Sequence, residues 1–235
     1  MAEIITDYEK LCDRADEIDT TKQSKEMRSI ITELKHTVKE NNLLGLAANQ
    51  IGHNKRIIVI NYSGDIRSYV NPVLYNAKGL TVSRENSPSI PGKEYLVVRN
   101  QEVTVTYVTP LGKIKTEKFL GVAATMVQHL VNILDGVLIS DIGFEIDSNW
   151  DSFTEEEKNE LLDMYLESID LKRKAVQEEI DSNPELKQID DGIKFLTAIQ
   201  NGEVKLTPAT IHIDNADEIN AQLEKERKDK QDNAD

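Results

Sequence analysis

The stretch Gln128–Gly136, QHLVNILDG, decides how the rest of this 235-residue chain is interpreted. It lies within apolar residues at helical spacing, which predict a helix buried on one face: Val122, Met126, His129, Leu130, Ile133 and Leu134. A helix with the pattern His-Glu-x-x-His presents two imidazoles to one metal ion, beside a glutamate that handles protons. Here His129 keeps its place, but Leu130 stands at the glutamate position and Ile133 at that of the second histidine. A lone histidine on an apolar helix is more often a hydrogen-bonded core residue than a ligand.

Two upstream stretches change this comparison. GLAANQIG occupies residues 45–52, and ENSPSIPG occupies residues 85–92. In order and spacing, the three stretches resemble the signature motifs of peptide deformylases, the metal-dependent hydrolases that remove the formyl group from the N-terminal methionine of new bacterial and organellar chains. The resemblance covers residues 1 to about 146. It implies an α+β fold, with mixed strands around a central helix that carries the third motif.

The metal site of the resembled family is altered in this chain. In that family the metal is held by the cysteine of Glu-Gly-Cys-Leu-Ser and by both histidines of His-Glu-x-x-His, which correspond here to Ser87, His129 and Ile133. A serine hydroxyl stays protonated and binds divalent metals poorly, and isoleucine cannot bind them. Catalytic sites normally use three protein ligands, so we expect no bound metal and no other cofactor.

The catalytic positions implied by the resemblance are altered as well. Leu130 replaces the glutamate that would serve as general base, and Pro88 has no backbone N–H to donate to an oxyanion. Gln50 keeps the place of the glutamine that polarises the formyl oxygen. We therefore expect no functional catalytic residue at the vestigial family positions, which are Gln50, Ser87, Pro88, His129, Leu130 and Ile133.

Large apolar side chains at positions 130 and 133 favour a former cleft that is now wholly or partly filled by core. The alternative is an open cleft that binds peptides without cutting them, and the retained Gln50, Glu85 and Ser89 support it. Those three residues could equally serve as hydrogen-bonding struts.

The charge of the chain is concentrated in its last third. The net charge is −14, and residues 151–235 contain 23 acidic and 11 basic residues. This balance argues against nucleic acid as a partner, because phosphates attract clustered Lys and Arg. The single Cys12, the absence of a signal sequence and the absence of an apolar run of roughly 20 residues predict a soluble protein of a reducing compartment. We expect it in the cytoplasm, or in a virion if it is encoded by a phage.

The first part of the chain predicts an independent domain over residues 1–148. Apolar residues at i, i+3, i+4 spacing predict a helix over 25–40. A strand is predicted over 55–61, and alternation or β-branched composition predicts short strands at 66–70, 79–83, 94–98, 102–108 and 114–119.

Residues 151–235 predict an acidic helical extension. Ser152 or Thr154 can cap a first helix, and Asn183-Pro184 ends it and starts a second, so we predict an αα-hairpin over 154–201. A short strand at 210–213 and a disordered end over 224–235 follow. Two such helices cover each other's apolar stripes only in part, which leaves candidate interaction residues: Leu161, Tyr165, Ile169, Leu186, Ile189 and Ile193.

These observations favour a catalytically inactive deformylase-like protein, used as a structural, assembly or binding component. Deformylase-like genes are common in bacteriophages, so a phage particle is a reasonable setting. We expect a protein partner or self-association through the C-terminal helices, with no nucleic acid and no membrane. One alternative is a regulatory binder of nascent peptides or of a host partner, which requires an open cleft. Another is an active metal-dependent deformylase with rebuilt ligands, such as His129 with Asp135 or Glu85.

Overall fold

The computed structural model describes residues 2–20, 25–62, 64–146, 149–188 and 190–191. The chain divides into two compact units, Met1–Leu171 and Lys172–Asp235. The elements are α1 (Tyr8–Leu11), α2 (Lys25–Glu40), β1 (Gly45–Ala47), η1 (Ala48–Ile51), β2 (Ile57–Tyr62), β3 (Asp65–Ser87), β4 (Ile90–Val108), β5 (Ile114–Leu120), α3 (Val122–Leu134), α4 (Ile139–Ile142), β6 (Phe144–Ile146), η2 (Trp150–Ser152) and α5 (Glu155–Ser182).

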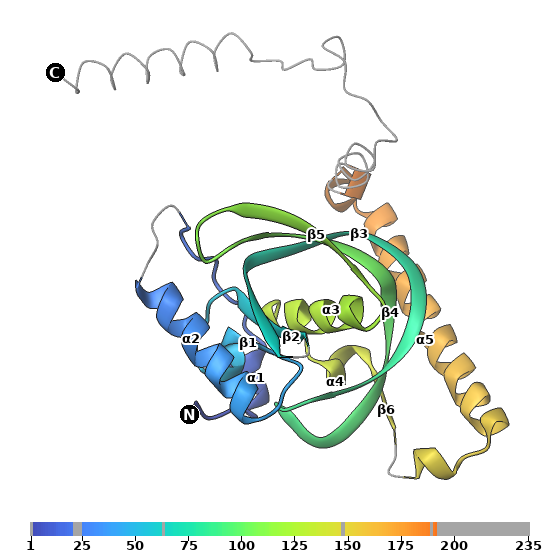
Figure 1. Ribbon diagram of the computed structural model, residues 1–235. Helices are drawn as coiled ribbons and strands as arrows, with labels where there is room; N and C mark the ends of the chain where they lie inside the picture. The colour runs from blue at the N-terminus through green and yellow to red at the C-terminus, as the bar shows by residue number, and fades with distance from the viewer. Residues whose placement is uncertain (1, 21–24, 63, 147–148, 189, 192–235) are drawn as a thin grey trace, which may run out of the picture. The chain divides into compact units, whose positions relative to one another are not determined.

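The strands of the described residues form one antiparallel sheet in the order β1-β2-β3-β4-β5. The sixth strand, β6, pairs with the first part of β4, and β5 pairs with its last part. The sheet curves around α3, which carries the QHLVNILDG stretch (Figure 1). This arrangement confirms the predicted α+β fold with mixed strands around a central motif-bearing helix.

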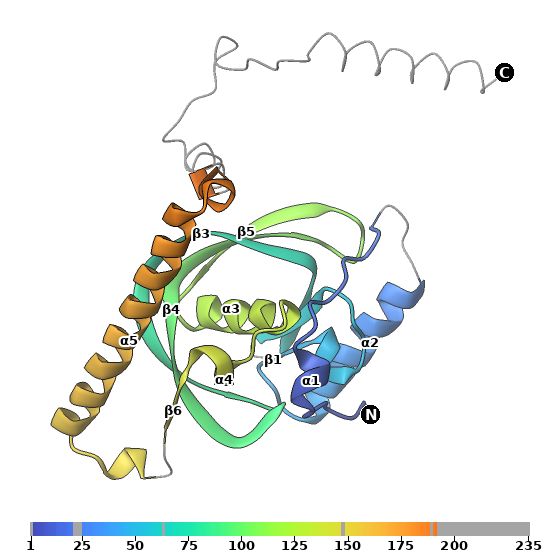
Figure 2. The same cartoon turned by 180° about the vertical axis from the view of Figure 1, so that it is seen from behind.

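Strand β2 is buried on both faces, because helices cover it from opposite sides. Ile58 and Ile60 belong to the apolar cluster around α3, whereas Ile57 and Val59 belong to the cluster around α2. Figure 2 shows α2 on the outer side of this part of the sheet. The predicted helix over 25–40 is confirmed, and its buried stripe consists of Met27, Ile30, Ile31, Leu34 and Val38.

The strands predicted at 66–70, 79–83, 94–98 and 102–108 all lie in strands of the structure, but they are parts of two long strands and not separate short ones. β3 and β4 pair along almost their whole length and are joined by a two-residue turn, with Ser87 opposite Ile90. The pairing register shifts between Val70 and Val73 and again between Tyr75 and Lys78. Each shift interrupts the alternation of inward and outward side chains, so one bent strand has the sequence pattern of separate short strands.

Helix α5 begins and ends where the sequence predicts. Thr154 caps it: the Glu157 N–H donates to Thr154 Oγ1 at 3.3 Å, and the Thr154 N–H donates to Glu157 Oε2 at 2.8 Å. The helix ends at Ser182, and residues 184–188 are helical again after Asn183, whose Oδ1 accepts from the Glu185 N–H at 3.0 Å. The rest of the predicted hairpin, the strand over 210–213 and the end of the chain lie outside the described residues.

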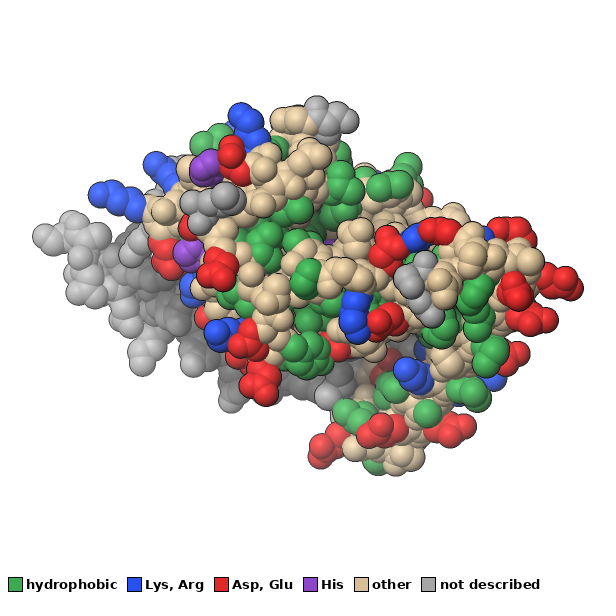
Figure 3. All heavy atoms as spheres, turned by 90° about the horizontal axis from the view of Figure 1, so that it is seen from below, with side chains coloured by type: hydrophobic (Ala, Val, Ile, Leu, Met, Phe, Trp, Pro, Cys, Tyr) green, Lys and Arg blue, Asp and Glu red, His purple; other side chains and the backbone are tan. Residues whose placement is uncertain are grey.

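The surface is mixed in character. On the face seen in Figure 3, acidic side chains gather toward one end, and hydrophobic side chains lie among charged ones in the middle. No helix among the described residues is long and apolar enough to span a bilayer.

Replacing Gly136 with alanine is expected to lower the free energy of unfolding by about 2 kcal/mol or more. Gly136 has a φ of 76°, and a Cβ placed there would lie 2.0 Å from the carbonyl oxygen of Cys12. Gly92→Ala is the matched control, because Gly92 has a φ of 75° and a Cβ placed there would have no atom within 4 Å. Urea unfolding of both variants separates the clash from the backbone strain. If both variants lost the same free energy of unfolding, the backbone around Cys12 would be shown to move away from the added Cβ at no cost.

Candidate functional site

The three sequence motifs meet beside α3 and are hydrogen bonded to one another. The GLAANQIG stretch forms β1 and η1, and Gln50 Nε2 donates to Ser89 Oγ in the ENSPSIPG turn at 3.0 Å. From the same stretch, Asn49 Nδ2 donates to the carbonyl oxygen of Ile133 in α3 at 2.7 Å. His129 Nδ1 of α3 lies 2.9 Å from Glu85 Oε2 at the end of β3. Each motif is therefore held in place by the other two.

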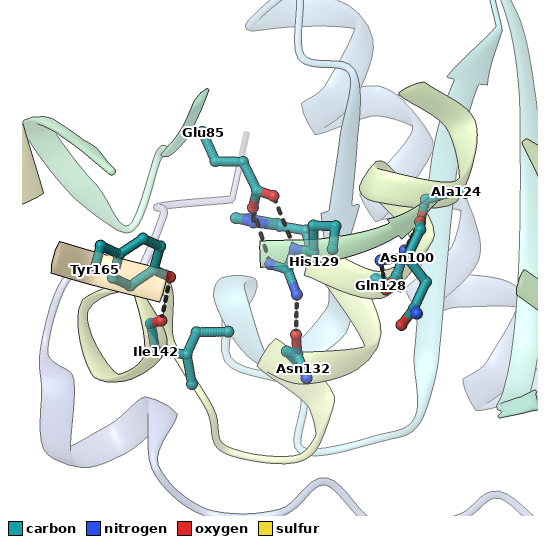
Figure 4. A network of polar contacts seen from close by, with 9 residues as sticks. Glu85, Asn100, Ala124, Gln128, His129, Asn132, Ile142 and Tyr165 are labelled. Atoms are coloured by element: carbon teal, nitrogen blue, oxygen red, sulfur yellow. Dashed lines mark hydrogen bonds and ion pairs between the residues drawn. The ribbon is translucent and has the colours of Figure 1, made fainter. Parts of the chain in front are cut away.

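Glu85 is the centre of a buried ionic network (Figure 4). Arg99 of β4 donates to both of its oxygens, from Nε to Oε1 at 2.8 Å and from Nη2 to Oε2 at 2.9 Å. Arg99 Nη1 also donates to Asn132 Oδ1 on α3. Burial alone would raise the pKa of Glu85, but the hydrogen bonds and charges of Arg99 and His129 outweigh it and lower the pKa below its ordinary value. Glu85 is therefore a carboxylate at neutral pH.

The contact with Glu85 fixes the orientation of His129. A carboxylate accepts hydrogen bonds, so Nδ1 carries a proton that it donates to Glu85, and this contact holds the ring in place. His129 lines a pocket with a volume of about 350 Å³, together with Gln50, Glu85, Pro88 and Leu130. This pocket therefore combines an amide, a carboxylate and an oriented imidazole.

Leu130 and Ile133 are core residues, each only 1% exposed. Leu130 also forms part of the pocket wall, where it packs closely on β1: a Cβ added to Gly45 would lie 2.7 Å from Leu130 Cδ1. The expected filling of the former cleft is partial: both side chains are buried, and a pocket lined by Leu130 stays open. Glycine at position 45 is what allows the helix and the strand to approach so closely.

Sequence reasoning missed Arg99, although a signal was available. Arg99 is in phase with the buried Val97 on β4, and its side chain is 4% exposed. An arginine at a core-facing position of a strand needs a buried acid, and Glu85 is that acid. Gln128 was also missed. It joins α3 to β4 by accepting from the Asn100 N–H at 3.0 Å and donating to the Asn100 carbonyl oxygen at 2.8 Å.

The proposed interaction residues of the extension have different environments. Tyr165 is buried, packs with Leu96 and Ile146, and donates its hydroxyl proton to the Ile142 carbonyl oxygen at 2.8 Å. Ile169 packs against the same cluster, and Leu161 is half-buried. Leu186 is 38% exposed, while positions 189 and 193 lie outside the described residues. Part of the first stripe thus packs on its own unit, and contact with a partner stays a prediction, as does the domain boundary at residues 148–151.

Comparison with known proteins places this site in a family. A family model described as Polypeptide deformylase matches residues 1–146. The chain belongs to this family. The peptide deformylase of Dictyoglomus turgidum is 31% identical over 124 residues, which are 53% of this chain and 81% of that protein. The peptide deformylase of Orientia tsutsugamushi is 34% identical over 139 residues, covering 53% of this chain and 76% of that protein.

Solved structures of peptide deformylases share the fold. The crystal structure of peptide deformylase from Thermotoga maritima matches with a TM-score of 0.57 and 26% identity, and covers 60% of this chain and 97% of that chain. A deformylase from Synechococcus elongatus, solved in complex with actinonin, matches with a TM-score of 0.57 and 28% identity, and covers 70% of this chain and 85% of that chain.

The comparisons contradict the expectation of a catalytically inactive structural, assembly or phage-particle component. The family and these relatives are named for an enzyme, and the alternative of a regulatory binder has no support among them. The expectation rested on altered residues at family positions. These are the metal ligands replaced by Ser87 and Ile133, the glutamate replaced by Leu130 and the oxyanion donor replaced by Pro88.

The metal of the family does not fit the residues present. Ser87 accepts a hydrogen bond from the Ser89 N–H at 3.3 Å, and Ile133 is packed in the core. Within the described residues, no three side chains of His, Cys, Asp or Glu lie close enough together to hold a metal ion. A single imidazole and a protonated hydroxyl are a poor donor set for a divalent transition metal.

Proposed function

We propose that this chain hydrolyses the formyl group at the amino terminus of peptides, as a divergent deformylase that works without the metal of its family. The name shared by its relatives supports the substrate class. The observation that carries the proposal is that Gln50, Glu85 and His129, one from each motif, line the same pocket. The proposed setting is the cytoplasm.

In this proposal His129 is the general base. Its Nε2 accepts a proton from a water molecule, while Glu85 stabilises the resulting imidazolium through Nδ1. The hydroxide adds to the formyl carbon. Gln50 Nε2 has a second N–H besides the one bonded to Ser89, and that N–H donates to the oxygen that becomes negatively charged. The C–N bond then breaks as the imidazolium returns its proton to the leaving nitrogen, which yields formate and a free amine.

The rate expected from these groups is low. A general base contributes about 100-fold to 10,000-fold, and one oxyanion donor contributes about 100-fold to 1,000-fold. Leu130 cannot accept a proton, and Pro88 has no N–H to add as a second donor. We therefore expect slow turnover that does not depend on added metal.

Formate release from formyl-Met-Ala is expected from the full-length protein in the presence of a chelator. His129→Asn should lower this release about 100-fold or more, because the proton acceptor is lost. His53→Asn is the matched control: His53 Nε2 also pairs with a carboxylate, Glu33 Oε2 at 2.8 Å, but it is not among the residues that line this pocket. If the unchanged protein released no more formate than His129→Asn does, the proposed hydrolysis would be refuted. If the chelator abolished formate release, the proposal that the reaction needs no metal would be refuted.

A further inference from the structure

The pocket beside His129 continues into a second hollow. That hollow has a volume of about 720 Å³ and is lined by the middle of β3, Gln101 and Glu102 of β4, the end of β5 and the start of α3. The two share four lining residues, which are Ser83, Arg84, Val122 and Thr125. A peptide with its first residue in the pocket can therefore extend its following residues over Arg84 into the second hollow, since an extended chain advances about 3.3 Å per residue.

Arg84 is the charged side chain that both cavities share, and it is already paired with two carboxylates. Its Nη1 and Nη2 lie 2.8 and 3.3 Å from the two oxygens of Asp151, and its Nε lies 3.0 Å from Glu94 Oε2. This fork-like contact with Asp151 matches the geometry with which a guanidinium recognises any carboxylate. The other charged residues of the second hollow are Lys78 and Glu102. Glu102 is paired with Lys118 at 2.7 Å.

The two carboxylates that pair with Arg84, those of Glu94 and Asp151, lie on different kinds of element. Glu94 lies on β4, directly across the hairpin from Asn86, and 40% of its side chain is exposed. Asp151 lies in the three-residue helix η2, and 75% of its side chain is exposed. Ion pairs between exposed side chains contribute little free energy, so another carboxylate can replace Asp151 at little cost.

We propose that Arg84 is a specificity residue, which binds an acidic side chain in the segment that follows the first residue of the bound peptide. In the free protein Asp151 pairs with the guanidinium of Arg84, and the carboxylate of the bound peptide replaces Asp151 in this contact. This inference rests on the proposed function, because it requires that a peptide begins in the pocket beside His129. It assigns to the second hollow a preference for peptides with Asp or Glu near their amino terminus.

The test compares two peptides that differ in one charge, formyl-Met-Ala-Glu-amide and formyl-Met-Ala-Gln-amide, by calorimetric titration of the full-length protein. The wild type is expected to bind the Glu peptide roughly three-fold to ten-fold more tightly, and this preference should shrink as salt is added. Arg84→Gln should abolish the preference, and Arg84→Lys should keep part of it. Asp151→Asn should tighten binding of the Glu peptide alone, because the competing carboxylate is gone.

Lys93→Gln is the matched control variant. Lys93 is also an exposed cation in an ion pair, with Glu145 at 2.9 Å, but it lines neither of the two cavities. It should leave the preference unchanged, and a loss equal to that of Arg84→Gln would overturn the assignment. Binding of both peptides with equal affinity by the wild type would overturn the role of Arg84 and leave the proposed function standing. Binding of neither peptide would overturn both.

Discussion

The triple variant Ser87→Cys, Leu130→Glu, Ile133→His is expected to bind about one zinc ion per chain, and the unchanged protein is expected to bind no stoichiometric metal. The changes add a thiolate and a second imidazole to His129, which completes three protein ligands. Position 133 lies one turn after His129 on α3, so both imidazoles lie on the same side of the helix. Elemental analysis after dialysis measures the gain directly.

Without zinc, the triple variant is expected to be less stable than the unchanged protein. Leu130 and Ile133 are core residues, and burying a glutamate and a histidine without partners costs several kcal/mol. Added zinc should raise the melting temperature, because it binds the folded state, in which the three ligands converge, more tightly than the unfolded chain. The variant Ser87→Cys, Leu130→Glu, which retains Ile133, is the control and should gain little. A stoichiometric metal in the unchanged protein, or none in the triple variant, would contradict this account of the site.

Replacing Glu85 with alanine is expected to lower the free energy of unfolding by about 3–5 kcal/mol, because it leaves the buried guanidinium of Arg99 without its counter-ion. Both side chains are almost fully buried, so solvent does not screen the loss. Glu94→Ala is the control, because Glu94 pairs with Arg84 in an exposed ion pair and its loss should change the free energy of unfolding little. Urea unfolding at neutral pH compares the two, and equal losses would contradict the role of burial.

The same network predicts how stability changes in acid. The pKa of Glu85 is lower in the folded protein than in the unfolded chain, where the pKa of a glutamate is about 4.3. The contribution of Glu85 to the free energy of unfolding is therefore fully present above that pH. It is lost as the pH falls through the lower pKa of Glu85 in the folded protein. Glu85→Gln should lack this part of the acid dependence. An unchanged slope of unfolding free energy against pH in that variant would assign the acid sensitivity to other groups.

Sequence periodicity predicted those elements whose cause is local. The stripe of α2, the cap at Thr154 and the stop at Asn183 depend on residues within a few positions, and the structure has each of them. The length of β3 and β4 was not predicted, because their bulges are defined only by the strand opposite. Likewise, Gln50 and His129, which the motifs singled out, line the same pocket. The role of Arg99 depends on the pairing of β3 with β4, which brings residues far apart in sequence together.

The two-residue turn between β3 and β4 also has a kinetic consequence. Ser87 and Ile90 are three positions apart, whereas Val70 and Val108, at the far end of the same ladder, are 38 apart. Closing a longer loop costs more entropy, so we infer that this hairpin zips from the turn outward, on the scale of microseconds. The turn belongs to the ENSPSIPG motif and includes Pro88, which lines the pocket. Replacements there should change the refolding rate as well as peptide binding, because the same turn closes the hairpin and forms part of the pocket wall.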